Sequence, residues 1–281
     1  MSGALDLDHL RQWIGRSTEA SDIVTAQLVR GLRATLFLDI GEPKGGDTAP
    51  FTVHWCLAQP VFPAAELGPD GHPARGGFLP PVPLPRRMWA GGELEFLDTL
   101  RVGDEATRRS EIADVTMKTG STGTLCFVAV NHVITTARGP AIRERQDLVY
   151  RDVTGSASPA RSMAAPPAAQ HRETHMADPV LLFRYSALTF NGHRIHYDRD
   201  YATKVEGYPG LVFHGPMQAA LMVEFAARLH GRVPKTFSYR GVQPLFDGAE
   251  FSVNANTTAD GLELWAANAE GLPTMKAKAA W

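Results

Sequence analysis

One segment near the end of the 281-residue chain constrains the fold more than any other. Residues 217–229 read MQAALMVEFAARL, apolar on almost every face of a helix, and such a helix is normally buried. Gly231 follows it as a typical C-terminal cap. The strand-like runs that come next lie at residues 235–246, 249–258, 262–269 and 274–281. The pattern predicts a buried helix wrapped by an antiparallel sheet.

The first half of the chain has a similar order of elements. Residues 23–34 carry apolar side chains at helical spacing, and a stretch rich in proline and glycine follows at 59–85. Strand-like runs then occupy residues 92–100, 105–118 and 122–136. This order predicts an α+β fold, a double hot-dog, in which each of two domains is a curved antiparallel sheet around a central helix.

A change of composition predicts where the two domains meet. Residues 154–179 are rich in Ala, Pro and Ser and show no sustained hydrophobic period, which is typical of a linker. We therefore expect an N-terminal domain over residues 1–153 and a C-terminal domain over residues 180–281.

Composition narrows the classes of partner and the compartment. The formal net charge of -2 provides no global basic field for nucleic acid. No apolar run approaches the length of a membrane span, and the N-terminus lacks the pattern of a signal peptide. Cys56 and Cys126 lie in apolar runs and are expected to be buried free thiols. We expect a cytoplasmic protein that binds neither nucleic acid nor membrane.

The segment with the most chemistry is FRYSALTFNGHRIHYD, residues 183–198. It is expected to follow a short strand at residues 181–183 as an exposed loop or short helix. His196 lies three residues after His193 and five after Asn191. Because an imidazole can accept a proton near neutral pH, His196 is a candidate general base.

A second candidate feature is the start of the apolar helix. Gly215 and Pro216 lie at the expected first turn, where proline is favourable and glycine allows close approach of a ligand. Backbone N–H groups at a helix N-terminus are unpaired and favour negative charge. The N–H of Gly215 is therefore a candidate donor to a carbonyl oxygen that gains charge during a reaction.

These runs carry a resemblance to a known family. FNGHRIHYD (190–198) and GLVFHGPMQAALM (210–222) resemble the MaoC-like hydratases, whose motif is Asp, four residues, then His, with a later His-Gly at the hot-dog helix. The chain is similar more closely to the subgroup of mitochondrial-type 3-hydroxyacyl-thioester dehydratases, mesaconyl-C4-CoA hydratases and itaconyl-CoA hydratases. GGFLPPVPLPRRMWAGGELEF (76–96) resembles their N-terminal dehydratase-like domain.

The resemblance implies a hydro-lyase that reversibly adds water to an enoyl-CoA thioester, with a short dicarboxylic acyl group as the expected substrate. It places His196 at the family's histidine and Asn191 at the family's aspartate. Because an amide does not exchange a proton in the required pH range, the family's two-residue scheme does not transfer intact. We expect His196 to act through one water that Asn191 orients, with Gly215 polarising the carbonyl. Asp198 or His193 remain alternatives for the second role.

Six further residues are candidates for binding the substrate: Tyr185, Arg184, His193, His214, Arg86 and Arg87. Adjacent arginines suit a phosphate or carboxylate, although a solvated loop is the simpler explanation for them. Arg194 is a similar case, because it can pair with Asp198. No metal-ligand constellation is visible and no cofactor is expected beyond the coenzyme A of the substrate. A homodimer is expected from the way hot-dog sheets associate.

Three other functions remain open or are disfavoured. A 3-hydroxyacyl-ACP dehydratase of fatty acid synthesis would have the same fold and the same histidine. A non-catalytic acyl-CoA binding protein is also compatible with the fold, because fold alone does not fix function. Thioester hydrolysis is disfavoured, because residues 208–218 contain no carboxylate at the helix start. The first half lacks the Asn-x4-His motif and is expected only to support the tunnel wall.

Overall fold

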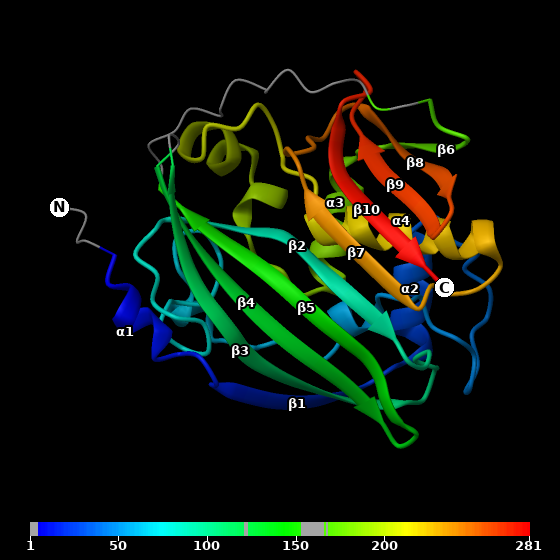
Figure 1. Ribbon diagram of the computed structural model, residues 1–281, viewed down its shortest axis with the longest axis horizontal. Coiled ribbons are helices and arrows are strands. Elements are labelled where there is room, and N and C mark those ends of the chain that lie inside the picture. Colours follow the sequence, from blue (N-terminus) through cyan, green and yellow to red (C-terminus); the bar gives the residue numbers. More distant parts are fainter. Residues whose placement is uncertain (1–4, 121–122, 153–165, 167) are drawn as a thin grey trace.

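The computed structural model describes residues 5–120, 123–152, 166 and 168–281. Within them, ten strands form one antiparallel sheet in the order β1-β3-β4-β5-β2-β7-β10-β9-β8-β6 (Figure 1). The first-half strands are β1 Ser17–Ile23, β2 Arg86–Phe96, β3 Glu105–Gly120, β4 Gly123–Thr136 and β5 Gly139–Arg151. The second-half strands are β6 His171–Met176, β7 Thr236–Gly241, β8 Glu250–Thr258, β9 Gly261–Ala267 and β10 Pro273–Ala280.

The two halves of the sheet repeat one strand order. In each, the first strand lies at the outer edge, the second at the seam, and the third to fifth between them. The seam is the antiparallel pair β2–β7, in which Gly92 lies opposite Tyr239 and Leu94 opposite Phe237. A Cβ on Gly91 would lie 2.5 Å from the Tyr239 carbonyl oxygen. The glycines of β2 therefore allow β7 to approach closely.

The helix α4, Gly215–His230, is the buried helix that the sequence predicts. Pro216 lies in its first turn, and Gly231 caps it in the left-handed conformation with φ 82°. Every residue from Met217 to Ala227 is buried. The helix packs on β8, β9 and β10, so the second half is a curved sheet around a central helix.

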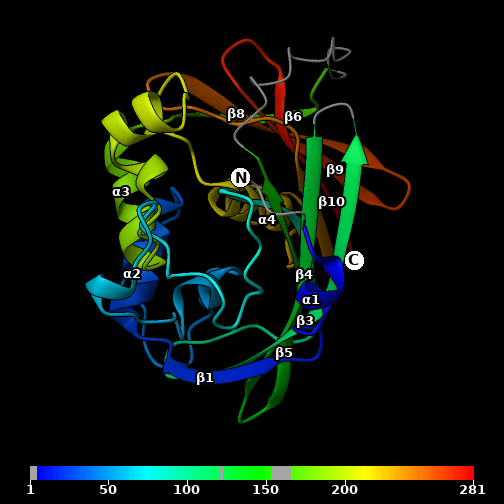
Figure 2. The same ribbon diagram turned by 90° about the vertical axis from the view of Figure 1, so that its left-hand side faces the viewer.

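The first half differs from the prediction of a second central helix. The predicted helix at residues 23–34 is α2, Ala26–Thr35, but α2 packs against α3, Pro179–Leu188, rather than on the strands of its own half. Figure 2 shows the loop segments between β1 and β2 lying between these helices and the sheet. This stretch holds only the short helices Val53–Cys56 and Ala64–Glu66, because prolines interrupt a longer one.

Two sequence predictions on the second half need correction. Residues 171–176, predicted as part of the linker, form β6 and pair with β8. Residues 181–183, predicted as a strand, lie in α3, whose start is fixed by Pro179 and by Asp178, which accepts the N–H of Val180. The linker residues 154–165 and 167 lie outside the described part of the chain.

Two hydrophobic clusters stabilise the fold. The larger joins α2, α3 and α4 to the sheet strands of both halves, and the smaller joins α1, Leu7–Arg11, to β3, β4 and β5. Cys56 lies in the larger cluster and Cys126 in the smaller, and both are free thiols, as predicted. Burial raises the pKa of Cys56 to about 12 and that of Cys126 to about 11. Neither thiol is therefore a reactive thiolate at neutral pH.

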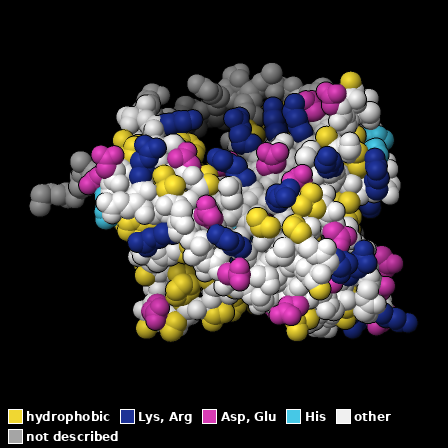
Figure 3. Space-filling view, turned by 60° about the horizontal axis from the view of Figure 1, so that its bottom comes forward, with side chains coloured by type: hydrophobic (Ala, Val, Ile, Leu, Met, Phe, Trp, Pro, Cys, Tyr) yellow, Lys and Arg dark blue, Asp and Glu magenta, His cyan; other side chains and the backbone are white. Residues whose placement is uncertain are grey.

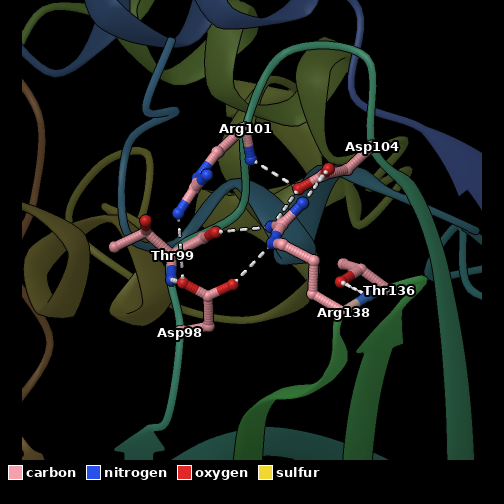
Figure 4. Close-up of polar contacts among 6 residues, drawn as sticks. All are labelled: Asp98, Thr99, Arg101, Asp104, Thr136 and Arg138. Atoms are coloured by element: carbon pink, nitrogen blue, oxygen red, sulfur yellow. Dashed lines mark hydrogen bonds and ion pairs between the residues drawn. The ribbon is translucent and has the colours of Figure 1, made fainter. Parts of the chain in front are cut away.

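An arginine holds the turn between β4 and β5 against the segment that follows β2 (Figure 4). Arg138 donates through Nε to Asp98 over 2.8 Å and through Nη1 to Asp104 over 2.6 Å. These hydrogen bonds lower the pKa of both carboxyl groups. Because the group is exposed, its main effect is to fix where this long hairpin ends.

The surface shows charges of both signs. Figure 3 shows Lys and Arg side chains interspersed with Asp and Glu over one face of the molecule. Among the described residues, no helix combines the length and the apolar character needed to cross a bilayer.

The buried carboxyl group of Glu224 makes the stability of the fold depend on pH. Its carboxylate is buried in α4 and accepts the N–H of Phe51 over 2.8 Å. Burial raises the pKa of Glu224 from its ordinary 4.5 to about 7. The native state therefore binds more protons than the unfolded state between these values, so the free energy of unfolding falls as the pH rises through that window.

We expect Glu224→Gln to raise the melting temperature at pH 8 by several degrees and to change it little at pH 4. Glutamine keeps an acceptor for Phe51 but carries no charge. Differential scanning fluorimetry at both pH values measures this, with the exposed Glu270→Gln as the control. An equal effect of Glu224→Gln at both pH values would contradict the prediction.

Candidate active site

Four histidine rings lie next to one another between the two halves of the chain. His193, His196 and His214 come from the second half and are buried, and His72 comes from the first. The ring centroids of His196 and His214 stack at 3.7 Å, those of His193 and His196 lie 5.5 Å apart, and those of His72 and His193 lie 4.2 Å apart. The candidate residues His193, His196 and His214 therefore lie in one cluster.

The tautomer of His196 is fixed by the backbone. The residue lies in the short helix Arg194–His196, and its Nδ1 lies 2.7 Å from the carbonyl oxygen of Val212. Since a carbonyl oxygen can only accept, Nδ1 carries the proton and Nε2 carries the lone pair. Nε2 makes no hydrogen bond within the described residues, so it is available as a base.

The ring of His214 is held in place at the start of α4. Its Nε2 shares a 2.9 Å hydrogen bond with the hydroxyl of Ser186 on α3, and Tyr185 meets its edge at 5.0 Å. Both His214 and Tyr185 are almost fully buried, and the Tyr185 hydroxyl has no hydrogen-bond partner in the described structure. Tyr185 therefore presents an unpaired polar atom to the interior beside the histidines.

Gly215 follows His214 as the first residue of α4. Its N–H finds no acceptor among the described residues, as expected of an N–H in the first turn of a helix. A Cβ at this position would lie 3.6 Å from Cε of Met275 and 3.9 Å from the Trp89 carbonyl. The donor predicted from the sequence is thus unpaired and next in the chain to a ring that stacks on His196.

Two loops from opposite halves are docked by their backbones at this site. A Cβ on Gly71, whose φ is +86°, would lie 2.0 Å from the carbonyl oxygen of Gly192. The N–H of Arg194 donates to the carbonyl of Asp70 over 2.9 Å. The loop that carries His72 is therefore fixed against the loop that carries His193 and His196.

His72 is paired with a carboxylate. Nδ1 of its ring lies 3.0 Å from one carboxylate oxygen of Asp70. Its backbone N–H donates to the other oxygen over 3.0 Å. Burial would raise the pKa of Asp70, but the hydrogen bond and charge of His72 hold it below its ordinary value. Asp70 is therefore ionised, and Nδ1 of His72 carries the proton that it accepts.

The sequence analysis missed the role of Asp70 and His72. The signal was the triplet Asp-Gly-His at residues 70–72, which parallels Asn-Gly-His at residues 191–193. Asp70, His72 and His193 each place one ligand atom within 4.8 Å of the others. Nδ1 of His72 is already used by the Asp70 carboxylate, so an internal hydrogen bond holds this cluster. Sequence spacing did not reveal the cluster, because the two segments are far apart in the chain.

Burial favours the neutral form of all four rings. Desolvation lowers the pKa of His196 to about 4 and that of His193 to about 2, and the neighbouring rings add to the effect. The pKa of His214 is likewise well below its ordinary value because of burial. Burial also lowers the pKa of His72, against the raising effect of Asp70. Neutral imidazoles are the state that a general base requires.

The two adjacent arginines of β2 have different environments. Arg86 pairs with the carboxylate of Glu206 over 3.0 Å, with both side chains mostly buried. No carboxylate of the described residues pairs with Arg87. Both arginines line a small cleft together with Asp70 and His193. Arg87 thus has no carboxylate partner among the described residues, and its side chain interacts with Tyr150.

The remaining candidates are engaged or distant. The side-chain oxygen of Asn191 accepts the N–H of His193 over 3.0 Å, which shapes the loop. Asp198 pairs with Arg194 over 2.7 Å. This is the ion pair that the sequence suggested for Arg194. Arg184 is exposed on α3 and makes no hydrogen bond or ion pair with the four rings.

The chain is similar in sequence to known proteins. The family model of hydroxyacyl-thioester dehydratase type 2 matches residues 51–247. The chain is 42% identical over 267 residues to the mesaconyl-C(4)-CoA hydratase of Chloroflexus aurantiacus, covering 94% of this chain and 95% of that protein.

Solved structures are similar in fold. A MaoC-like dehydratase from Phytophthora capsici aligns over 99% of both chains with 16% identity and a TM-score of 0.71. A Mycobacterium tuberculosis protein with a double hot-dog fold aligns over 95% of this chain and 96% of its own, with 12% identity and a TM-score of 0.54. The predicted double hot-dog fold is thereby confirmed, and the chain belongs to the hydroxyacyl-thioester dehydratase type 2 family.

Proposed function

We propose that the protein is a hydro-lyase that reversibly adds water to an enoyl-CoA thioester. The observation that carries this is His196, whose Nδ1 is fixed on the Val212 carbonyl while Nε2 is free. The ring stacks on His214, directly before the unpaired N–H of Gly215 at the start of α4. A base and an oxyanion donor are thus held close together, as hydration of an unsaturated thioester requires.

The reaction follows from these two groups. Nε2 of His196 removes a proton from water, and the water oxygen bonds to the β-carbon of the substrate. The electron pair of the C=C bond moves toward the thioester oxygen, where the Gly215 N–H stabilises the developing charge. A proton then bonds to the α-carbon and gives the 3-hydroxyacyl thioester. The thioester carbonyl stabilises the carbanionic α-carbon, so the proposed reaction needs no cofactor beyond the coenzyme A of the substrate.

A short dicarboxylic acyl group is the proposed substrate class. The relative from Chloroflexus aurantiacus is named for mesaconyl-C(4)-CoA, and identity to it extends over 94% of this chain. Arg87 supports this choice, because a guanidinium that lacks a carboxylate partner and lines the cleft with His193 can bind a free carboxylate. Itaconyl-CoA is the second substrate to test.

We expect wild-type protein to hydrate mesaconyl-C4-CoA or itaconyl-CoA faster than crotonyl-CoA in a spectrophotometric assay. His196→Asn keeps a donor for the Val212 carbonyl but removes Nε2, so it should lower kcat by about 100-fold or more. His196→Ala should lose as much. Preference for crotonyl-CoA or longer chains would favour a fatty-acid dehydratase, and unchanged turnover by His196→Asn would exclude His196 as the base.

The rate should stay high in acid for an enzyme with a histidine base. Because burial lowers the pKa of His196 to about 4, the base stays unprotonated down to that value. The acid limb of kcat/KM, which reports the free enzyme, is expected well below pH 6.5. Steady-state kinetics from pH 4 to 8, with Tm measured at each pH as a control for unfolding, checks this. A midpoint near 6.5 would contradict it.

Arg87→Met should change selectivity. Loss of a charged hydrogen bond to the substrate carboxylate is expected to lower the ratio of kcat/KM for mesaconyl-C4-CoA to that for crotonyl-CoA by about tenfold or more. Arg172→Met, at an exposed position on the edge strand β6, is the control. A ratio equal to that of the wild type would remove Arg87 from carboxylate binding.

A further inference from the structure

The proposed hydration requires a second proton transfer, and the usual carboxylate for it is absent. Asn191 stands at the position of the aspartate in the MaoC-like motif, and its side-chain oxygen already accepts the backbone N–H of His193. Asp198 accepts two hydrogen bonds from Arg194 and one from the N–H of Tyr201. Neither residue is therefore suited to deliver a proton to carbon.

We infer that the first half of the chain supplies the second proton-transfer residue of the reaction, His72, with Asp70 as the residue that positions it. The inference rests on the proposed hydration. It assigns a catalytic role to a half of the chain whose sequence suggested only a supporting one.

The geometry separates His72 from the other histidines near His196. His214 is tied to Ser186, and His193 has no hydrogen bond to its ring among the described residues. Only His72 has a carboxylate partner, and both Asp70 oxygens face it, one at its Nδ1 and one at its backbone N–H. A carboxylate on Nδ1 orients the ring and stabilises its protonated form, which is what a group that alternates between acid and base needs.

The position of His72 is set by contacts between the halves. Its ring lies against that of His193, with centroids 4.2 Å apart, and His193 in turn meets the edge of His196. The carbonyl of Asp70 accepts the N–H of Arg194, two residues before His196. The backbones of Gly71 and Gly192 lie so close that a side chain at position 71 would clash with the Gly192 carbonyl.

In each hydration one proton is gained by His196 and one is lost by His72. In hydration, His196 Nε2 takes the proton that water loses as the C–O bond forms at the β-carbon. The protonated form of His72, which Asp70 favours and burial opposes, then gives its Nε2 proton to the α-carbon. Dehydration is the reverse, with His72 taking the α-proton and His196 protonating the leaving hydroxyl. Solvent water returns the proton between turnovers.

Other charges act on His72. Arg75 and Arg87 oppose its protonation, and the neighbouring His193 is neutral. Asp70 favours protonation. A substrate carboxylate bound at Arg87 would offset one of the opposing charges, which links occupation of the site to the charge state of His72.

The test uses the variants His72→Asn and Asp70→Asn. Asparagine at position 72 can still donate to Asp70, so the loop keeps its anchor while Nε2 is lost. His175→Asn on β6, where a histidine faces Glu173 at 3.7 Å, is the matched control. We expect His72→Asn to lower kcat by about 100-fold or more with the KM and the Tm little changed. Asp70→Asn should lower kcat less and shift the pH profile.

Deuterium exchange at the α-carbon identifies the residue that transfers the carbon-bound proton. Incorporation of deuterium from D2O at the α-carbon of the 3-hydroxyacyl-CoA should persist in His196→Asn and disappear in His72→Asn. Exchange that survives in His72→Asn, or turnover within about threefold of the wild type, overturns the inference. A stoichiometric metal ion by elemental analysis, with loss of activity in EDTA, also overturns it, because Asp70, His72 and His193 would then be ligands.

An NMR titration without substrate tests the pairing of Asp70 with His72 independently of the proposed hydration. In 15N-histidine NMR titrations, the pKa of His72 is expected to fall in Asp70→Asn, because the carboxylate no longer stabilises the imidazolium. An unchanged titration overturns the positioning role of Asp70 whatever the activity. If the wild type hydrates none of the three enoyl-CoA substrates, the proposed hydration itself fails and the catalytic role of His72 fails with it.

Discussion

The antiparallel pairing of β2 with β7 is the contact on which the rest of the molecule depends. It makes one continuous sheet from two five-stranded halves, and it requires glycine at positions 91 and 92, where any side chain would meet the backbone or ring of Tyr239. Arg86 and Arg87 lie at the start of β2. The strand that joins the halves therefore also carries the charged groups at the cleft.

Exclusion of water gives the site its chemical character. The four imidazoles form a row in which each ring contacts the next, so neighbouring rings would repel if charged. Burial already favours the neutral form of each ring. Fixed hydrogen bonds then decide which nitrogen is free: the Val212 carbonyl for His196 and the Asp70 carboxylate for His72. Two bases with defined tautomers are thus held by different kinds of partner, one uncharged and one charged.

Much of the fold follows from local pattern. The apolar run at residues 217–229 and the alternating strands after it predicted the second half because a buried helix and a half-covered sheet leave clear periods. The first half was predicted less well. Its central helix is replaced by a proline-rich loop, and the helix α2 packs instead on α3, a contact between distant segments that no local pattern encodes.

The candidate site was predictable only in part for the same reason. His196, His193, His214 and Gly215 occur in two short motifs, and the structure brings them together. Arg86 and Arg87 look equivalent in the sequence, but only the fold shows that Glu206 neutralises the first. Asp70 and His72 escaped notice because their meaning depends on Gly71 docking against Gly192, a long-range fit of two backbones.

That fit has a consequence for how the chain reaches its native state. The bond from Arg194 to the carbonyl of Pro69 spans 125 residues, and contacts of such high sequence separation form late, after the loop-closure entropy has been overcome. During synthesis the first half emerges well before residues 191–196, so it can collapse around the smaller hydrophobic cluster but cannot assemble the histidine cluster. Maturation of the site thus coincides with completion of tertiary structure, and partly folded chains lack the aligned pair of imidazoles.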